Sequence, residues 1–206
     1  MRVIRLTTPL LALLAVTAAP LLAQNGEAPP RGLEIVPPHS PRDGFWANFG
    51  LGVGWETFSA PGATVDPGWL ARPTIDMRVG GTPSGNVRLG AEFVSWFNSE
   101  MNISQSLGGL AGIVQLYPSR TAGFFLKGGG GYAWNSFSDN YYYYGWGYIT
   151  YDAGFMWTAG AGWELPISKS LNIVPTVDYY AFDFGGRTTA DYSEQLWNVG
   201  VAIQIP

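Results

Sequence analysis

The sequence contains no cysteine and only one histidine, His39, among its 206 residues. The absence of cysteine excludes disulfide bonds and lipid attachment to an N-terminal cysteine. Zinc sites need cysteine or histidine at defined spacings, so the sequence predicts no metal site and no cofactor. Serine–histidine catalysis also needs a histidine, and none lies between Gly44 and Pro206. The sequence therefore predicts a protein that is not an enzyme and has no catalytic residues.

Charged residues are also scarce, at 13% of the chain, whereas glycine (28), tyrosine (11) and tryptophan (9) are abundant. Disordered chains show the opposite composition, with many charges and few aromatic residues. The formal net charge of −4 argues against a nucleic-acid partner, because nucleic acid selects a basic surface. After the N-terminal segment, no run of 18 apolar residues that could form a membrane helix occurs.

The N-terminal segment has the pattern of a secretory signal peptide. Basic residues in 1–5 precede an apolar run, 6–19, and cleavage is predicted after Ala19 or Ala23. An alternative is that this run remains as a membrane anchor, but it is short and interrupted by proline. We therefore predict a signal peptide (1–23), a proline-rich periplasmic linker (24–43) and one barrel domain (44–206).

From Gly44 the sequence alternates with a period of two, and one face of each predicted strand is free of charge. Most of the alternating segments are about 9–11 residues long, which is the length that a tilted strand needs to cross a bilayer. Short connections (80–85, 118–122 and 166–170) alternate with longer ones (59–68, 98–106, 135–150 and 183–194), and Pro73 and Pro175 fall inside predicted strands. The eight predicted strands are 45–55, 69–79, 87–97, 107–117, 123–135, 151–165, 171–182 and 196–205.

The segment 123–135 contains four consecutive glycines and could be mistaken for a phosphate-binding loop. In such a loop the lysine follows the last glycine, whereas Lys127 precedes Gly128. The period of two continues through the glycines, with aromatic residues on one face and Lys127 on the other. We predict a strand that directs its aromatic side chains to lipid and Lys127 to the barrel interior.

The two faces of the strands differ in bulk, which indicates the direction in which each points. An eight-stranded barrel has an interior just wide enough for side chains, and the face with glycines and scattered charges suits that space. The other face carries large apolar residues, and aromatic residues cluster near strand ends, as in membrane barrels. This favours a bacterial outer-membrane barrel over the alternative of a soluble, lipocalin-like periplasmic binding barrel.

Several segments resemble the small outer-membrane β-barrel family that includes the OmpA transmembrane domain, OmpX-like proteins and opacity-type adhesins. They are Phe49–Gly54, Gly123–Trp134, Thr158–Pro166 and Leu171–Tyr180, within 44–206. The resemblance implies an all-β, eight-stranded antiparallel up-and-down transmembrane barrel that is monomeric. We expect outer-membrane lipid, lipopolysaccharide and the barrel-assembly machinery as partners, with an unknown host or surface ligand as a further candidate. Barrel enzymes of this kind use a histidine near the outer rim, and this chain lacks one there.

Charged residues are predicted on the inner face of the barrel. Charges in a narrow, poorly hydrated interior are costly unless they are paired. We therefore expect an ion-pair network that fills the lumen, or alternatively a gate whose pairs rearrange to admit ions or water. The predicted members are Glu56, Arg72, Asp76, Arg78, Arg88, Glu92, Lys127, Glu164 and Asp178.

The third long connection is unusually aromatic and almost uncharged. Tyrosine and tryptophan are enriched at binding hot spots, so this connection is a candidate contact surface. An alternative is that the strands continue and these residues lie in the outer aromatic girdle or touch lipopolysaccharide. We predict a non-catalytic structural or adhesin-like surface protein, with a small low-conductance pore as the alternative. The candidate contact residues are Tyr141, Tyr142, Tyr143, Tyr144, Trp146 and Tyr148.

Overall fold

The computed structural model describes residues 42–60, 68–100, 103–139, 149–168, 170–185 and 191–205. The predicted signal peptide, His39 and the aromatic contact surface of residues 141–148 lie outside these ranges. No helix within the described ranges is long and apolar enough to cross a membrane.

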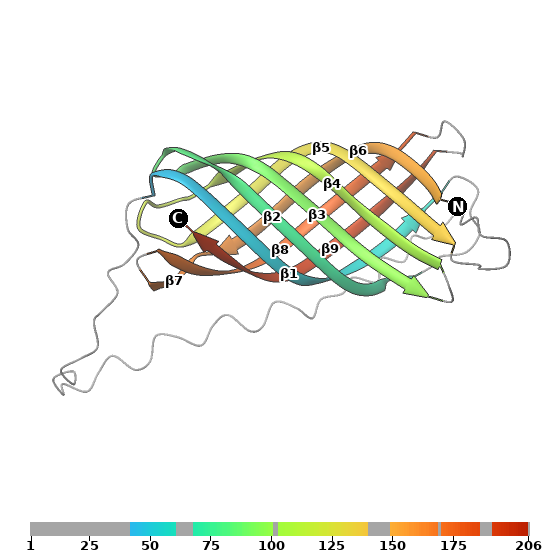
Figure 1. Cartoon of the computed structure of the whole chain (residues 1–206). Coiled ribbons are helices and arrows are strands. Elements are labelled where there is room, and N and C mark those ends of the chain that lie inside the picture. The colour runs from blue at the N-terminus through green and yellow to red at the C-terminus, as the bar shows by residue number, and fades with distance from the viewer. Residues whose placement is uncertain are drawn as a thin grey trace, which may run out of the picture. The chain divides into compact units, whose positions relative to one another are not determined.

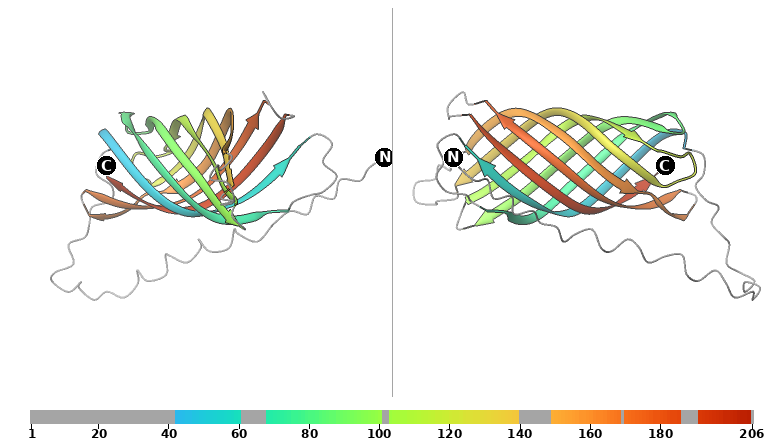
Figure 2. Two further views of the ribbon diagram at one scale, coloured as in Figure 1. Left: turned by 45° about the vertical axis from the view of Figure 1, so that its right-hand side comes forward. Right: turned by 180° about the vertical axis from the view of Figure 1, so that it is seen from behind.

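The described residues form one antiparallel sheet that closes on itself (Figures 1 and 2). Strand β1 pairs with both β2 and β9, and β6 pairs with both β5 and β8, so the ring of strands has no open edge. The short β7 continues the line of β6 along β8, so that β6 and β7 together occupy one strand position. The barrel is therefore eight-stranded, as predicted. The strands are β1 (Gly44–Ser59), β2 (Leu70–Ser84), β3 (Val87–Glu100), β4 (Ile103–Leu116), β5 (Phe124–Asp139), β6 (Ile149–Trp163), β7 (Leu165–Ser168), β8 (Leu171–Phe184) and β9 (Tyr192–Ile205).

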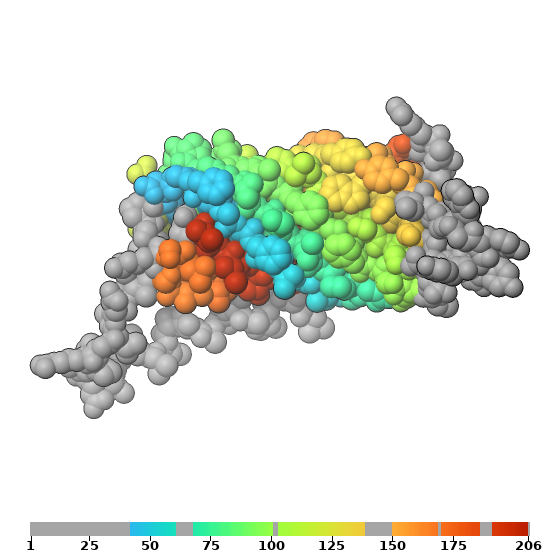
Figure 3. Space-filling view, viewed as in Figure 1, coloured from blue at the N-terminus to red at the C-terminus, as the bar shows by residue number. Residues whose placement is uncertain are grey.

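The outer wall of the barrel is apolar. In β9, buried and exposed positions alternate without interruption from Glu194 to Ile205, as the period of two requires. Large outward side chains such as Leu51 (59% exposed) and Trp157 (61%) cover the wall, and Figure 3 shows side chains of β1, β5 and β6 on one side of it. This distribution suits lipid and is the reverse of a soluble binding barrel, so the lipocalin-like alternative is wrong.

Several strands extend further than predicted. The long connection predicted at 98–106 is wrong, because β3 continues to Glu100 and β4 begins at Ile103, with Asn98 opposite Gln105. The predicted turn 80–85 is also shorter, since β2 runs to Ser84 through an irregular register. Polar outward residues at these ends resemble loop residues in sequence, although the backbone pairing continues through them.

The two prolines inside strands lie where a neighbouring ladder stops. Pro73 is opposite Val53 of β1, but the pairing of β2 with β3 begins only at Thr74. Pro175 falls between the β6–β8 pairing, which ends at Thr176, and the β7–β8 pairing, which ends at Ile173. Proline cannot donate to a ladder, and these gaps accommodate it.

Aromatic side chains partly cover the glycines of β5 on the outer wall. A Cβ atom built on Gly130 would lie 3.1 Å from Cζ of Phe155 and 3.2 Å from Cε3 of Trp157. These rings belong to β6, where Trp157 is directly opposite Gly130. The glycine run is therefore a regular strand whose bare backbone is screened by rings of the adjacent strand.

Candidate functional site

The two ends of the barrel can be distinguished by their connections. Strand β1 begins and β9 ends at the same end, where Ala47 is opposite Ile205. At this end only two residues separate β2 from β3 and β7 from β8, whereas at the other end nine residues separate β5 from β6 and seven separate β8 from β9. Outer-membrane barrels have short periplasmic turns and longer extracellular loops, which makes the first end periplasmic and the second extracellular.

Glu164, at the break between β6 and β7, is the centre of a cluster at the periplasmic end. Its carboxylate accepts hydrogen bonds from Tyr117 Oη (2.8 Å) and Gln204 Nε2 (2.8 Å). It also pairs with Arg88 and, at 2.9 Å, with Nε of Arg42. We call these five residues the periplasmic cluster; their side chains are buried.

Arg42 belongs to the predicted linker (24–43), but its side chain lies against the barrel. Its guanidinium is 3.8 Å from the centroid of the Tyr117 ring and donates to the carbonyl oxygens of Arg120 (3.1 Å) and Ala122. The barrel therefore includes Arg42. The only sequence signal for this role was a lone arginine just before the first strand.

A second cluster of charges lies deeper in the barrel. Arg78 is fully buried and its guanidinium is 2.7 Å from Glu92, 2.6 Å from Asp178 and 3.2 Å from Asp76. Lys127 pairs with Glu92 and, at 2.8 Å, with Asp178. These five residues form the central ion-pair cluster, which joins β2, β3, β5 and β8 across the lumen.

Two inward-facing glycines make room for this cluster. A Cβ atom on Gly50 would collide with the carboxylate of Asp76, and one on Gly160 with that of Asp178. Both glycines lie directly beside these acids in the register, on the neighbouring strands β1 and β6. The glycines of the inner face thus provide the volume that the charged side chains occupy.

Toward the extracellular side of the central cluster, the lumen is filled by large apolar side chains. The sequence interpretation described the interior as polar and did not identify this layer. The indole Nε1 of Trp96 donates to the carbonyl oxygen of Gly54 at 3.1 Å, which satisfies its polar group. We call this group the apolar layer; it includes the buried side chains of Trp96, Leu107, Met156, Phe182 and Leu196.

Two residues of the predicted network lie apart from both clusters. Arg72 donates to Asn98 at 2.8 Å and pairs with Glu100, at the extracellular end of the barrel. Glu56 is buried but has no ion-pair or hydrogen-bond partner among the residues that the structure describes. The prediction that Arg72 and Glu56 face the other charges in one network is wrong, because they lie beyond the apolar layer.

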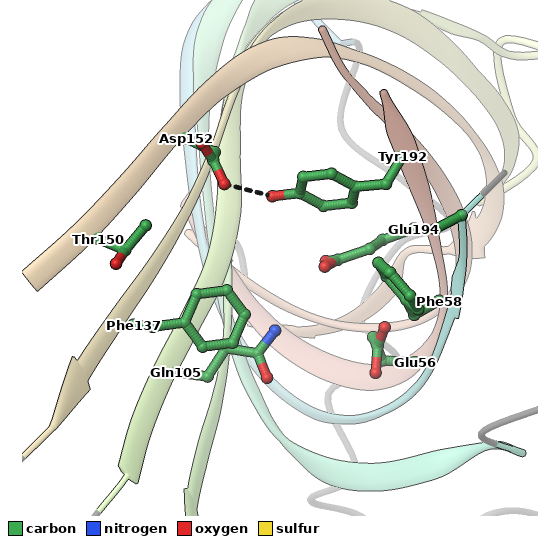
Figure 4. Close-up of a pocket in the computed structure, with 9 residues that line it drawn as sticks. Glu56, Phe58, Gln105, Phe137, Thr150, Asp152, Tyr192 and Glu194 are labelled. Atoms are coloured by element: carbon green, nitrogen blue, oxygen red, sulfur yellow. Dashed lines mark hydrogen bonds between the residues drawn. The ribbon is translucent and has the colours of Figure 1, made fainter. Parts of the chain in front are cut away.

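The extracellular mouth of the barrel holds a pocket of about 590 Å³. Figure 4 shows Phe137 and Phe58 on opposite sides of this outer pocket, with the carboxyl group of Glu194 directed between them. Gln105 and Thr150 also contribute to its wall. The residues that define its chemistry are three acids, Glu56, Asp152 and Glu194, and three rings, Phe58, Phe137 and Tyr192.

Glu194 lies beyond the outer aromatic residues of the barrel wall, since its neighbours Ser193 and Gln195 are polar. It is 2% exposed, and its Oε1 accepts a hydrogen bond from Asn135 Nδ2 at 2.6 Å. Its Oε2 has no hydrogen-bond partner. Burial, reinforced by the negative charges of Glu56 and Asp152, raises the pKa of Glu194 to about 8.

The sequence did not single out Glu194 or Asp152 as site residues. Glu194 is the last residue of the predicted connection 183–194. Asp152 lies at the start of the predicted strand 151–165 and has no evident partner in the sequence. In the structure, Tyr192 Oη donates to Asp152 Oδ2 at 3.0 Å across the mouth (Figure 4). No group of three or more potential metal-ligating side chains within the described ranges is placed to hold a metal ion.

Solved structures of small outer-membrane barrels are similar to this chain. Neisserial surface protein A, from Neisseria, aligns with a TM-score of 0.52 and 10% identity over 78% of this chain and 96% of that one. Ail, the attachment invasion locus protein of Yersinia pestis, aligns with a TM-score of 0.50 and 12% identity over 79% and 99%. A scan of protein-family models and a search of curated protein sequences found no match.

The closed antiparallel sheet, the apolar outer wall and the paired charges inside define a transmembrane β-barrel of the bacterial outer membrane. Aromatic residues at both ends of the wall agree, with Trp55 opposite Trp197 and Phe124 beside Trp163. At such low identity the likeness to the solved structures concerns the fold alone. The chain has the fold of the small eight-stranded outer-membrane barrels, as the resemblance predicted.

Proposed function

We propose that this protein is a non-catalytic, adhesin-like barrel that acts at the cell surface through its extracellular end. The main observation behind this proposal is that buried side chains fill the lumen at two heights along the barrel axis. Trp96 and Leu107 of the apolar layer and Arg78 of the central ion-pair cluster are fully buried. With the lumen filled, contacts with other molecules fall to the two ends of the barrel, and the extracellular end is the one that faces other cells.

The aromatic segment 141–148 supplies contact residues for this proposal. It carries Tyr141–Tyr144, Trp146 and Tyr148 within a connection between β5 and β6. Such residues give a large contact area at low cost in side-chain entropy. Ail, which is similar in fold, is named an attachment invasion locus protein, and this name agrees with an attachment role without establishing one for this chain.

A small pore is the competing function. Conduction would need a continuous water-filled path, and both the apolar layer and the central ion-pair cluster lie across that path. A gate built from Arg78 and Lys127 would have to break four ion pairs to Glu92 and Asp178 in a buried setting, which is costly. The structural role of the ion pairs is therefore the interpretation that we adopt.

Replacing Tyr141–Tyr144 by serine is expected to reduce the attachment of expressing cells to host cells or extracellular matrix by about tenfold or more, because aromatic hot spots dominate contact energies. Attachment is compared at equal amounts of surface protein. Tyr132→Ser, on the lipid-facing wall, is the matched control and should retain attachment. Equal attachment by the wild type and the four-tyrosine variant would refute the adhesive role.

A further inference from the structure

We infer that the outer pocket is a binding site for a small organic cation, a primary amine with an apolar body. Glu56, Asp152 and Glu194 supply negative charge, and Phe58, Phe137 and Tyr192 supply ring surfaces. This assignment goes beyond the adhesive role and does not depend on it, since none of these residues lies in the segment 141–148. The pocket volume of about 590 Å³ falls within the range of small-molecule sites.

Glu194 provides the observation that points to a ligand. Its carboxylate is almost completely buried, yet Oε2 has no hydrogen-bond partner. Buried polar atoms in native proteins are nearly always satisfied, and without a cationic partner burial keeps this carboxyl group protonated at neutral pH. In Figure 4 this carboxyl group points into the pocket, where the ammonium group of a ligand would donate to it.

The charge of the pocket selects a cation. Glu194 faces Glu56 of β1 and Asp152 of β6, and both acids act on its titration. Glu56 has no partner, and Asp152 accepts only from the neutral hydroxyl of Tyr192, among the described residues. The pocket lining that the structure describes contains no lysine or arginine, and in the proposed complex the ligand supplies the positive charge.

The rings of the pocket select an organic cation over a metal ion. The three acids are not placed to hold a metal ion together. Cations bind over aromatic faces, and quaternary and primary ammonium groups are recognised in this way. Phe58 and Phe137 stand on opposite sides of the pocket (Figure 4), so that an alkyl chain could pack between them while its ammonium group reaches Glu194.

The pocket is blind, which distinguishes a binding site from a channel entrance. The next inward residues along the same strands are Leu196, two residues from Glu194, and Leu107, two residues from Gln105. Both leucines are fully buried in the apolar layer. A ligand that enters from outside is therefore held at the mouth of the barrel.

Isothermal titration of the detergent-solubilised barrel with cadaverine tests this inference. Binding to the wild type is expected, and Glu194→Gln should weaken it by about tenfold or more, since a charge-assisted hydrogen bond is lost. Asp183→Asn is the matched control, because Asp183 is an exposed acid at the extracellular end of β8. This variant should bind cadaverine normally. Absence of binding to the wild type, or equal binding by Glu194→Gln, would overturn the inference.

Two further measurements keep the test independent of the folding of the variant. Neutral pentanediol should not compete with cadaverine, and equal binding of the diol would contradict a cation site. Cadaverine should bind the wild type more tightly at about pH 9 than at about pH 6.5, because Glu194, and with it the facing Glu56, loses its proton between them while the amine stays charged. Affinity that is unchanged across this interval would also contradict it.

A free amine and a lysine side chain present the same ammonium chemistry. N-acetyl-lysine methylamide distinguishes these two sources. Tighter binding of cadaverine would support a free amine as the ligand, whereas tighter binding of the blocked lysine would support a basic side chain of a partner protein.

Discussion

Replacing Arg78 by leucine is expected to lower the free energy of unfolding by about 3–5 kcal/mol, the usual cost of removing one partner from a buried ion pair. The guanidinium of Arg78 contacts three carboxylates, on Asp76, Glu92 and Asp178, from three different strands. Without Arg78, Lys127 alone would balance these three charges. Leucine also cannot restore the fork of donors with which arginine joins separate acids.

Unfolding by urea in detergent micelles, followed by fluorescence of the nine tryptophans, measures this loss. Arg120→Leu is the control, because the side chain of Arg120 lies exposed in a periplasmic turn, where it donates a hydrogen bond to Asn86. Such surface changes usually alter stability by less than about 0.5 kcal/mol. If Arg78→Leu were as stable as Arg120→Leu, the carboxylates would have to be hydrated, and the filled lumen would be wrong.

Replacing Trp96 by alanine is expected to cost about 3–5 kcal/mol, as for large aromatic residues removed from other protein cores. The indole is fully buried in the apolar layer and is hydrogen-bonded to Gly54 of β1. Its removal would leave a cavity bordered by Leu196, and also a carbonyl oxygen without its donor. The barrel wall is a closed ring of ladder bonds, so it cannot collapse to fill this space.

Trp163→Ala is the matched control for Trp96→Ala in the same unfolding experiment. Trp163 is outward-facing and contacts Phe124, and lipid or detergent chains can occupy the space that it leaves. A smaller loss of stability is therefore expected than for Trp96→Ala. Equal losses would indicate that the apolar layer does not contribute as a packed core.

The barrel wall was predictable because residue types alternate with a period of two along each strand, and this alternation shows which side chains face outward. In β4, which carries no charged residue, Leu110 is exposed and Ile113 is buried, as alternation with a period of two requires. Lys127 was placed in the lumen on the same basis and is buried there. Alternation between small or charged and bulky apolar residues is a local property, so it can be read without the rest of the fold.

The partners across the lumen were not predictable in the same way. Arg78 and Asp178 are 100 residues apart and do not lie on adjacent strands. The period of two gives the face of each residue but not its height in the barrel, which depends on the register of every intervening strand. For this reason Arg72 and Glu56 were grouped with charges from which the apolar layer separates them.

The extracellular end was the hardest part to predict. Outward residues such as Ser193 and Gln195 are polar there, because the strands have left the apolar band. Polar residues on both faces resemble a loop, so the sequence ended the last connection at Glu194 although β9 begins at Tyr192. The outer pocket is formed by these strand extensions, and its acids come together only through the closure of the barrel.

Current recording in planar lipid bilayers tests most directly that the lumen is filled. The purified wild-type barrel is expected to give no stable channel steps above the baseline current, because the apolar layer and the central ion-pair cluster lie across the lumen. Large, stable channels that conduct by diffusion in the wild-type protein would contradict a filled lumen and would favour the pore.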